Sequence, residues 1–385
     1  MKILITGAFG FVGSNLSAYL ANKGYELWAL DVKDSSKVLK CESSKVGDEC
    51  DSAYSRSFTW QQLGEIPWSE VYAVVHLAGK AHDTKNTSDA QSYFDINTGL
   101  TKKILEEFSR KDAKAQSEEK KFILFSSVKA VADSVEGVLT EKATPNPKTP
   151  YGQSKLAAEQ EVEKEVLKFE SSKVLKCLKS GEVEKCASAG MRECASLEGD
   201  DGGSGTTNEL MNSCTNELLY YILRPCMIHG PGNKGNLNLL YNIVRKGIPW
   251  PLGAFENQRS FASIENICAV VDGLLSKDIK SGAYHVADDD AVSTNDLIGM
   301  IAESQGRKAR IWSCPKGVIY FVAKVGDLLH LPLNSERLKK LTESYVVSNA
   351  KVKDTLGWDK MPVGAKEGML KTLKSFSRKG AKTQR

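Results

Sequence analysis

The sequence lacks the features that would place a protein in a membrane or outside the cell. No uninterrupted apolar run reaches the roughly 20 residues that a membrane-spanning helix needs. The longest candidate, Val318 to Leu333, contains Lys324, Asp327 and His330. The first residues lead directly into a glycine-punctuated segment and do not form a secretory leader with a cleavage site. We therefore expect a cytoplasmic protein with no membrane partner.

Cysteine spacings typical of structural sites are also missing. The chain has nine cysteines, an odd number, which argues against the disulfide framework of a secreted protein. None of them is spaced like the Cys-x-x-Cys pairs of a zinc site, so we expect no bound metal. Cys226, Cys268 and Cys314 lie in apolar surroundings that suit buried thiols.

The chain has no strong charge imbalance. Its 52 basic and 48 acidic side chains give a net charge of +4, and its composition is close to the globular average, with 41% hydrophobic and 26% charged residues. Much of the excess lies between Lys366 and Arg385, in a tail that we expect to be solvated. We expect no nucleic-acid partner. A chain of 385 residues is long enough for a large core and two domains.

The N-terminal segment has the pattern of a nucleotide-binding turn. The apolar run Lys2 to Thr6 predicts a buried parallel strand, and a helical pattern from Ser14 to Lys23 follows the turn. The turn is G-x-x-G-x-x-G: Gly7 permits the tight turn, Gly10 allows the backbone to approach a pyrophosphate, and Gly13 allows close helix packing. The pattern predicts a dinucleotide held at the start of this helix.

An acidic residue completes this pattern. A second strand, Glu26 to Leu30, ends at Asp31, where a carboxylate would accept hydrogen bonds from the adenosine ribose. The same carboxylate would repel a 2′-phosphate. The cofactor is therefore expected to be NAD, not NADP.

Polar and small residues follow later strands at the edge where open α/β sheets bind their ligands. The strand Val71 to Leu77 leads into Ala78 and Gly79, whose small size would let a cofactor lie close. A helix from Tyr93 to Phe108 carries Asn97. The strand Lys121 to Phe125 precedes Ser126 and Ser127, and the strand Leu218 to Leu223 precedes Arg224 and Pro225.

A tyrosine and a lysine stand one helical turn apart after Pro150. Tyr151 and Lys155 share a helix face, so a phenol and an ammonium occupy one small volume. The positive charge of Lys155 would stabilise the phenolate of Tyr151 and bring the pKa of this tyrosine towards neutrality. Tyr151 is therefore a candidate general acid or base.

Two irregular stretches interrupt the pattern of strands and helices. One runs from about residue 33 to 58, and the other covers residues 169 to 216, after a helix predicted over Leu156 to Lys168. Both contain the heptapeptide Ser-Ser-Lys-Val-Leu-Lys-Cys, which indicates related inserted segments. Long loops without periodicity are disordered or specialised, and we favour disorder here.

The assembled residues resemble the extended short-chain dehydrogenase/reductases, in the NAD-dependent epimerase/dehydratase family of nucleotide-sugar enzymes. The resemblance implies a Rossmann doubly wound parallel sheet over residues 1–226, a smaller mixed α/β substrate domain over 227–371 and a basic tail over 372–385. It rests on these residues: Gly7, Gly10, Gly13, Asp31, His76 to Gly79, Asn97, Ser127, Tyr151, Lys155, Leu223 to Pro225, Ile228 to Gly232, Gln258 to Phe261 and Leu356 to Trp358.

The resemblance also implies roles for particular residues. Tyr151 would exchange the proton of a sugar hydroxyl, and Lys155 would bind the nicotinamide ribose. Ser127 would orient the substrate, with Ser126 as the alternative. The cofactor-binding residues would be Gly7, Gly10, Phe11, Gly13, Asp31, Leu77, Ala78, Gly79, Asn97, Tyr151, Lys155 and Pro225.

The substrate would be held by residues in the C-terminal part of the chain. Asn236 and Arg259 are expected to contact the nucleotide sugar, and Arg259 suits a diphosphate because its guanidinium is planar. Arg337 is a weaker diphosphate candidate. His229 is interpreted as a substrate-pocket or structural residue, not a catalytic one.

The two residues after Ser127 reduce the number of reactions that the site could catalyse. Family members that eliminate water usually carry Asp-Glu at this point, but this chain has Val128 and Lys129. We therefore expect an epimerase acting at C4 of a UDP-hexose, with or without an N-acetyl group, in polysaccharide synthesis. A 4-ketoreductase, a dehydrogenase for a non-sugar alcohol and a non-catalytic NAD-binding scaffold stay open as alternatives, and the resemblance implies a homodimer.

Overall fold

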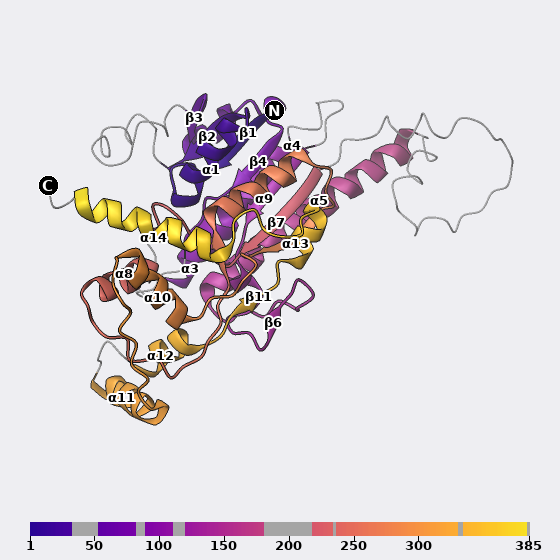
Figure 1. Cartoon of the computed structure of the whole chain (residues 1–385). Coiled ribbons are helices and arrows are strands. Elements are labelled where there is room, and N and C mark those ends of the chain that lie inside the picture. The colour runs from indigo at the N-terminus through magenta and orange to yellow at the C-terminus, as the bar shows by residue number, and fades with distance from the viewer. Residues whose placement is uncertain are drawn as a thin grey trace.

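The fold is a parallel sheet with helices on both faces, extended by a second group of helices (Figure 1). The computed structural model describes residues 1–32, 53–81, 89–110, 120–180, 218–233, 236–329 and 334–382. Within these ranges no helix is long and apolar enough to cross a membrane.

The central sheet has seven strands in the order β10-β7-β5-β4-β1-β2-β3, and every neighbouring pair is parallel. This order reverses direction between β1 and β4, which is the switch point where doubly wound sheets bind nucleotides. The predicted Rossmann fold is therefore confirmed. The strands are β1 (Lys2–Thr6), β2 (Glu26–Asp31), β3 (Arg56–Thr59), β4 (Ala73–His76), β5 (Lys120–Phe125), β7 (Leu218–Pro225) and β10 (Gly282–Val286).

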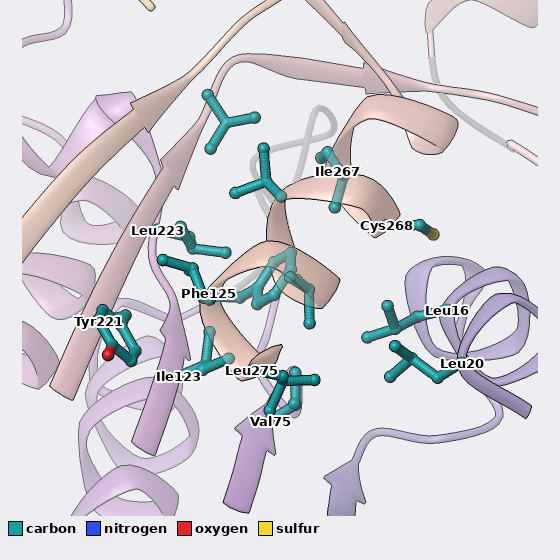
Figure 2. Close-up of a cluster of buried hydrophobic side chains, with 14 of the residues drawn as sticks. Leu16, Leu20, Val75, Ile123, Phe125, Tyr221, Leu223, Ile267, Cys268 and Leu275 are labelled. Carbon is teal, nitrogen blue, oxygen red and sulfur yellow. The ribbon is translucent and has the colours of Figure 1, made fainter. Parts of the chain in front are cut away.

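Alternation along β1 shows why the sheet is covered on both faces. Ile3 and Ile5 point into one hydrophobic cluster and Leu4 into another, and all three side chains are fully buried. Helices α1 (Phe11–Asn22) and α9 (Ile264–Ser276) cover the first face, as Figure 2 shows for Leu16 and Ile267. Helices α4 (Gly99–Arg110) and α5 (Pro150–Ser180) cover the second.

Short elements connect these layers. The helix predicted over Tyr93 to Phe108 is divided into three parts, with a π-helical turn in the middle that carries Asn97. These elements are α3 (Ala90–Tyr93), the π-helix η3 (Phe94–Thr98), the 3-10 helices η1 (Trp60–Glu65), η2 (Trp68–Glu70) and η5 (Val128–Ala130), and the paired strands β6 (Val138–Leu139) and β11 (Val346–Val347).

The C-terminal part of the chain forms a second group of elements but also returns to the sheet. Strand β10 and helix α9 complete the sheet and one of its layers, so part of the chain after residue 226 also contributes to the Rossmann sheet. The reason is that β7 needs a partner on its open edge, and β10 supplies it. The other elements are β8 (Met227–His229), β9 (Phe261–Ser263), α8 (Asn236–Arg245), α10 (Thr294–Ser304), α11 (Lys316–Leu329), α12 (Ser335–Thr342), α13 (Ala350–Leu356) and α14 (Ala365–Lys382).

The structure corrects one end of each predicted irregular stretch. Arg56–Thr59 forms edge strand β3 beside β2, and α5 continues to Ser180 instead of ending near Lys168. Residues 33–52 of the first stretch and 181–216 of the second lie outside the described residues.

The predicted solvated tail is also corrected. Met369, Leu373 and Phe376 are buried in α14 and pack against α8 and α10, with the Phe376 ring centroid 5.5 Å from that of Tyr241. The three residues recur at helical spacing and form one apolar stripe. The prediction relied on net charge and missed this stripe.

Candidate active site

The glycine turn is built so closely that side chains would not fit. Gly7 has a φ of +65°, and a Cβ at this position would lie 2.9 Å from the Ala78 nitrogen. A Cβ on Gly13 would lie 2.4 Å from the Ala8 carbonyl oxygen. Gly7 therefore lets the turn approach the end of β4, and Gly13 lets the first turn of α1 pack against the turn itself.

The start of α1 is open to an anion. Gly10 is the N-cap, and no side chain caps this helix end. The first amide groups of a helix carry a partial positive charge and suit phosphate. Asp31 closes the turn from the next strand, because its carboxylate accepts hydrogen bonds from the Phe9 amide at 3.0 Å and the Val32 amide at 2.6 Å.

The end of β4 is fixed by a buried hydrogen-bond chain. Thr6 Oγ1 lies 2.8 Å from His76 Nδ1 and accepts a hydrogen bond from the Ala78 amide at 3.0 Å. Burial, together with the charge of nearby Lys155, lowers the pKa of His76 to about 3, so this ring is neutral at physiological pH. The chain holds the peptide of Ala78 next to Gly7.

Asn97 joins this strand end to α5. Its Oδ1 accepts a hydrogen bond from the Lys80 amide at 2.7 Å, and its Nδ2 donates to Ser154 Oγ at 2.9 Å. The π-helical turn places it there, and such turns are frequent at functional sites. A Cβ on Gly79 would lie 2.8 Å from Asn97 Oδ1 and 3.1 Å from Lys155 Nζ, so these three residues converge.

Tyr151 lies in the first turn of α5, opposite the serine that follows β5. Pro150 begins the helix, where a missing amide is tolerated. A Cβ on Gly152 would lie 2.4 Å from the Lys129 carbonyl oxygen, so the helix start is packed directly against η5. This packing brings the Ser127 hydroxyl into hydrogen-bond contact with the Tyr151 phenol.

The environment of Tyr151 differs from the sequence-based expectation. Burial raises the pKa of Tyr151, the hydrogen bond with Ser127 partly opposes this effect, and neighbouring Tyr93 adds to it. The Tyr93 ring packs edge-on at a centroid distance of 6.1 Å. Burial dominates, so the expectation of a lowered Tyr151 pKa is wrong in this structure. The lysine shares the helix face, but its ammonium is directed elsewhere.

The Lys155 ammonium is buried at the end of β5. Its Nζ donates a hydrogen bond to the Phe125 carbonyl oxygen at 2.9 Å. Burial lowers the pKa of Lys155 to about 8, and the negative charge of Glu159 opposes this effect. A buried lysine with a nearby carboxylate stays protonated at neutral pH but loses its proton under mildly alkaline conditions.

The sequence analysis did not predict the buried ion pair between Arg224 and Glu159. Arg224 contacts Glu159 through Nε at 3.0 Å and Nη2 at 2.6 Å, and the Ser126 hydroxyl donates to the same carboxylate. Glu159 stands four residues after Lys155, and this spacing was the available signal. Ser126 therefore belongs to the support of the site, whereas Ser127 faces Tyr151.

The residues predicted to hold the substrate are only partly placed. Arg259 is half-buried, its Nε donates to the Glu343 carbonyl oxygen at 3.2 Å, and burial lowers its pKa. Pro225 ends β7 in register with Val286. Asn236 begins α8 and Arg337 lies in α12, but their side chains are outside the described part of the structure.

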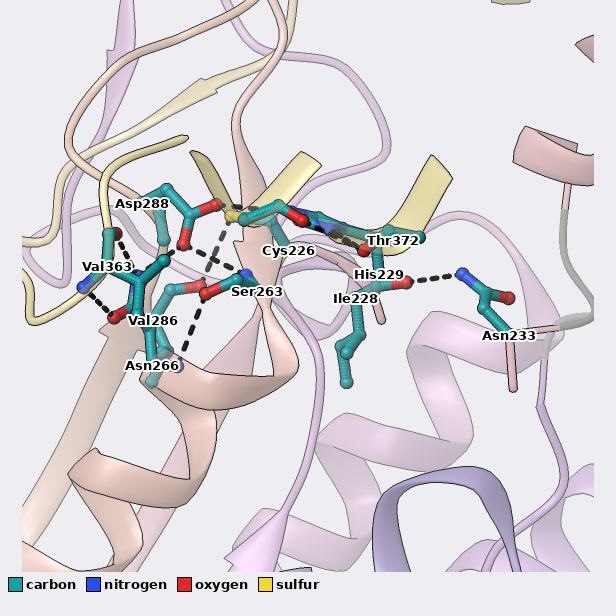
Figure 3. A network of polar contacts seen from close by, with 12 residues as sticks. Cys226, Ile228, His229, Asn233, Ser263, Asn266, Val286, Asp288, Val363 and Thr372 are labelled. Carbon is teal, nitrogen blue, oxygen red and sulfur yellow. Dashed lines mark hydrogen bonds and ion pairs between the residues drawn. The ribbon is translucent and has the colours of Figure 1, made fainter. Parts of the chain in front are cut away.

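His229, in β8, belongs to a polar network that also includes Asp288 and Thr372 of α14 (Figure 3). Its Nδ1 lies 3.0 Å from Thr372 Oγ1, and its Nε2 lies 3.2 Å from Asp288 Oδ2. Asp288 also accepts hydrogen bonds from the Ser263 amide and from Asn266 Nδ2. Of the two interpretations of His229, the structure therefore favours the structural one.

These residues fit a dinucleotide. The open helix start and the Gly7 turn suit a pyrophosphate, Asp31 lies at the end of the adjacent strand, and Gly79 lets Asn97 and Lys155 approach the end of β4. Among the described residues, no group of three or more His, Cys, Asp or Glu side chains could hold a metal ion. The carboxyl edge of the sheet thus combines a glycine turn that suits a pyrophosphate with the phenol of Tyr151, the hydroxyl of Ser127 and the ammonium of Lys155.

Several known proteins are similar to this chain in sequence or in fold. A UDP-glucose 4-epimerase of Vibrio cholerae is 26% identical over 381 residues, covering 97% of this chain and 95% of the relative. An N-acetyl-alpha-D-glucosaminyl-diphospho-ditrans,octacis-undecaprenol 4-epimerase of Escherichia coli O157:H7 is 24% identical, covering 91% of this chain and 84% of the relative. A UDP-glucuronic acid 4-epimerase from Bacillus cereus, solved in complex with NAD, has the same fold with a TM-score of 0.62 at 18% identity, covering 98% of this chain and 99% of that one.

The N-terminal part of the chain matches a known family. Residues 3–175 match the NAD dependent epimerase/dehydratase family. This range contains the glycine turn, Asn97, Ser127, Tyr151 and Lys155. The N-terminal domain is therefore similar to the NAD dependent epimerase/dehydratase family, and NAD is the cofactor that the site suits.

Proposed function

We propose that the protein is an NAD-dependent epimerase that inverts C4 of a nucleotide-linked hexose. The observation that supports this most is the contact between Ser127 and Tyr151 at the carboxyl edge of the sheet, with the Lys155 ammonium buried beside Gly79 and Asn97. A hydroxyl, a phenol and an ammonium at one sheet edge suit proton transfer at a sugar alcohol.

In this proposal Tyr151 exchanges the proton of the 4-hydroxyl group. Burial raises the pKa of Tyr151, so the phenol would give up its own proton when the positively charged nicotinamide is bound. The phenolate would then accept the proton of the 4-hydroxyl group as hydride leaves C4 and return it when hydride comes back, and Ser127 would orient the substrate oxygen towards it. The cofactor, when bound, supplies a positively charged nicotinamide that takes up a hydride and gives it back. Lys155 holds a positive charge beside Asn97 and Gly79, where it would bind the nicotinamide ribose.

The surroundings of Val128 and Lys129 support this reaction over elimination of water. Val128 is buried in an apolar cluster with Val131 and Leu139. Lys129 Nζ donates to the Asp133 carbonyl oxygen at 2.6 Å and lies 4.0 Å from the centre of the Tyr345 ring. Neither side chain offers the extra acid and base that a dehydratase needs.

Epimerisation is favoured over the alternatives because the relatives that align with more than 90% of the chain, the two described above among them, are named 4-epimerases. One name gives a UDP-linked sugar and the other an N-acetylated sugar on a lipid diphosphate. We propose a UDP-hexose, with or without an N-acetyl group, as the substrate. Arg259 and Asn236 would contact it, and Pro225 would line the cofactor site.

The cytoplasm is proposed as the compartment in which the protein acts. Cys226, Cys268 and Cys314 are free thiols, which suits the reducing cytoplasm. A homodimer stays a prediction, and light scattering on the purified protein would test it.

The proposed function is tested by incubating the protein with UDP-glucose, UDP-N-acetylglucosamine and their C4 epimers and following the products by NMR. An epimerase produces the C4 epimer without net consumption of NADH. Consumption of NADH in proportion to a 4-keto sugar would replace the proposal with a 4-ketoreductase. Absence of turnover on every nucleotide sugar would favour the non-catalytic scaffold or the dehydrogenase for a non-sugar alcohol.

A further inference from the structure

The segment after Ser127 is tied together by the side chain of Lys129. Ser127 is the N-cap of η5, and its Oγ accepts a hydrogen bond from the Lys129 amide at 3.2 Å. The Lys129 ammonium donates to the Asp133 carbonyl oxygen at 2.6 Å. The main chain from Ser127 to Asp133 is therefore held as one compact loop, and the position of Ser127 depends on that of Asp133.

The carboxylate of Asp133 holds the beginning of α5. Its Oδ2 accepts hydrogen bonds from the Lys148 amide at 2.6 Å and the Thr149 amide at 3.2 Å, and its Oδ1 accepts one from the Thr149 hydroxyl at 2.9 Å. Thr149 Oγ1 in turn accepts a hydrogen bond from the Gly152 amide at 3.3 Å. Thr149 therefore caps the first turn of the helix that carries Tyr151, and Asp133 holds this cap in place.

The loop and the helix start also pack directly against each other. Gly152 is buried, and a Cβ there would lie 2.4 Å from the Lys129 carbonyl oxygen. Farther along, the Asn146 amide donates to the Val131 carbonyl oxygen at 2.8 Å. The packing at Gly152 limits how closely the two segments approach, and the hydrogen bonds of Asp133 limit how far they separate.

We propose that Asp133 is a positioning residue that keeps Ser127 and Tyr151 in contact. It reaches Ser127 through Lys129. It reaches the turn that carries Tyr151 through Thr149. The inference rests on the proposed function, because that function gives the contact between Ser127 and Tyr151 its part in catalysis.

The contact that Asp133 maintains is sensitive to small displacements. The Lys129 amide occupies one lone pair of Ser127 Oγ, and the hydroxyl proton of Ser127 is available for the Tyr151 oxygen. A hydrogen bond of this kind favours the phenolate, and the bond with Ser127 accordingly lowers the pKa of Tyr151 against the effect of burial. Displacement of reacting groups by about 1 Å costs roughly 100-fold in rate.

A purely structural role for Asp133 is separated from positioning by a matched control, Asp327→Ala. Asp327 accepts hydrogen bonds from the Ser335 amide at 2.9 Å and from the Ser335 hydroxyl at 2.5 Å, at the start of α12. It therefore holds a helix start with the same kinds of contact as Asp133. Helix α11, which carries Asp327, contains none of the residues assigned to the site.

The first measurement does not depend on turnover. In protein labelled with ¹³C-tyrosine, the Cζ resonance of Tyr151 is assigned by its absence from Tyr151→Phe, and Ser127→Ala shows where it lies without the hydrogen bond. We expect Asp133→Ala to move the resonance at least about half as far in the same direction, and Asp327→Ala to leave it in place. In the Ser127→Ala background, Asp133→Ala should add little, because both changes remove one contact.

The second measurement is the turnover of the nucleotide sugar that the unchanged protein epimerises. Asp133→Ala should lower kcat at least about tenfold while KM changes less than about threefold, because Asp133 holds the reacting groups and not Arg259. Asp133→Asn keeps one acceptor oxygen for the two amides and should retain more of kcat than Asp133→Ala. Asp327→Ala should keep the kcat of the unchanged protein.

The inference is overturned if the Tyr151 resonance of Asp133→Ala coincides with that of the unchanged protein, or if Asp133→Ala and Asp327→Ala have the same kcat. If Asp133→Ala does not fold, Thr149→Val removes only the hydroxyl contact with Asp133, and an unmoved Tyr151 resonance in that variant overturns the inference as well. Absence of turnover by the unchanged protein would refute the proposed function, and the resonance would still decide the role of Asp133.

Discussion

Replacement of Glu159 by glutamine should destabilise the protein more than any other single change of charge at the site. Glu159 is 1% exposed and holds both Arg224, through two contacts at 3.0 and 2.6 Å, and the Ser126 hydroxyl. Glutamine has a similar shape but no charge, so the Arg224 guanidinium is left buried and unpaired. Breaking a buried ion pair in this way costs about 3–5 kcal/mol of unfolding free energy.

The matched control is Glu367→Gln. Glu367 pairs with Lys371 at 2.7 Å, but these side chains are 62% and 48% exposed. An exposed pair one helical turn apart contributes about 0.5 kcal/mol or less. The two variants therefore remove the same charge from contacts of similar length, and they differ mainly in burial.

The assay is urea unfolding followed by circular dichroism and tryptophan fluorescence. We expect Glu159→Gln to lower the midpoint strongly and Glu367→Gln to leave it nearly unchanged. A loss below about 1 kcal/mol for Glu159→Gln would refute the reasoning, because it would mean that Arg224 finds another partner or reaches water.

The remaining predictions concern the catalytic edge and the glycine turn. Ser127→Ala should lower kcat by roughly 100-fold while NAD affinity is kept, whereas Ser126→Ala should keep kcat and lose about 1–3 kcal/mol of stability; kinetics and unfolding of both variants check this. Gly13→Ala should lower the free energy of unfolding by about 1–3 kcal/mol or more, because its Cβ would lie 2.4 Å from a carbonyl oxygen. The control Gly299→Ala in α10 meets nothing within 4 Å and should raise the free energy of unfolding by up to about 1 kcal/mol. An unchanged thermal midpoint in Gly13→Ala would contradict the geometry. The kcat/KM should fall as the pH rises through about 8, since Lys155 then loses its proton, and a profile that is flat from neutral pH to beyond this value would contradict the role of the ammonium.

The parts of the fold that local pattern controls were predictable. The buried runs of β1 and β5 and the spacing of Gly7 and Gly13 appear in the structure as expected. Periodicity also placed Tyr151 and Lys155 on one helix face. These features depend on neighbours in sequence, so a single chain contains enough information to locate them.

Features that depend on partners distant in sequence were missed. The pairing of Glu159 with Arg224 joins α5 to β7 across 65 residues, and the direction of the Lys155 ammonium depends on the Phe125 carbonyl oxygen. The return of β10 to the sheet likewise follows from an open strand edge, which no local pattern shows. From the sequence, the charge of Lys155 was expected to lower the pKa of Tyr151. In the structure, burial dominates and raises this pKa.

The central claim is that Tyr151 exchanges the proton at C4 of a nucleotide sugar. The most direct measurement compares the unchanged protein with Tyr151→Phe by NAD titration and by NMR of the C4 epimers formed from UDP-glucose and UDP-N-acetylglucosamine. The account predicts unchanged NAD affinity and a loss of epimer formation of at least about 100-fold in the variant. Epimer formation by Tyr151→Phe at the rate of the unchanged protein would contradict it.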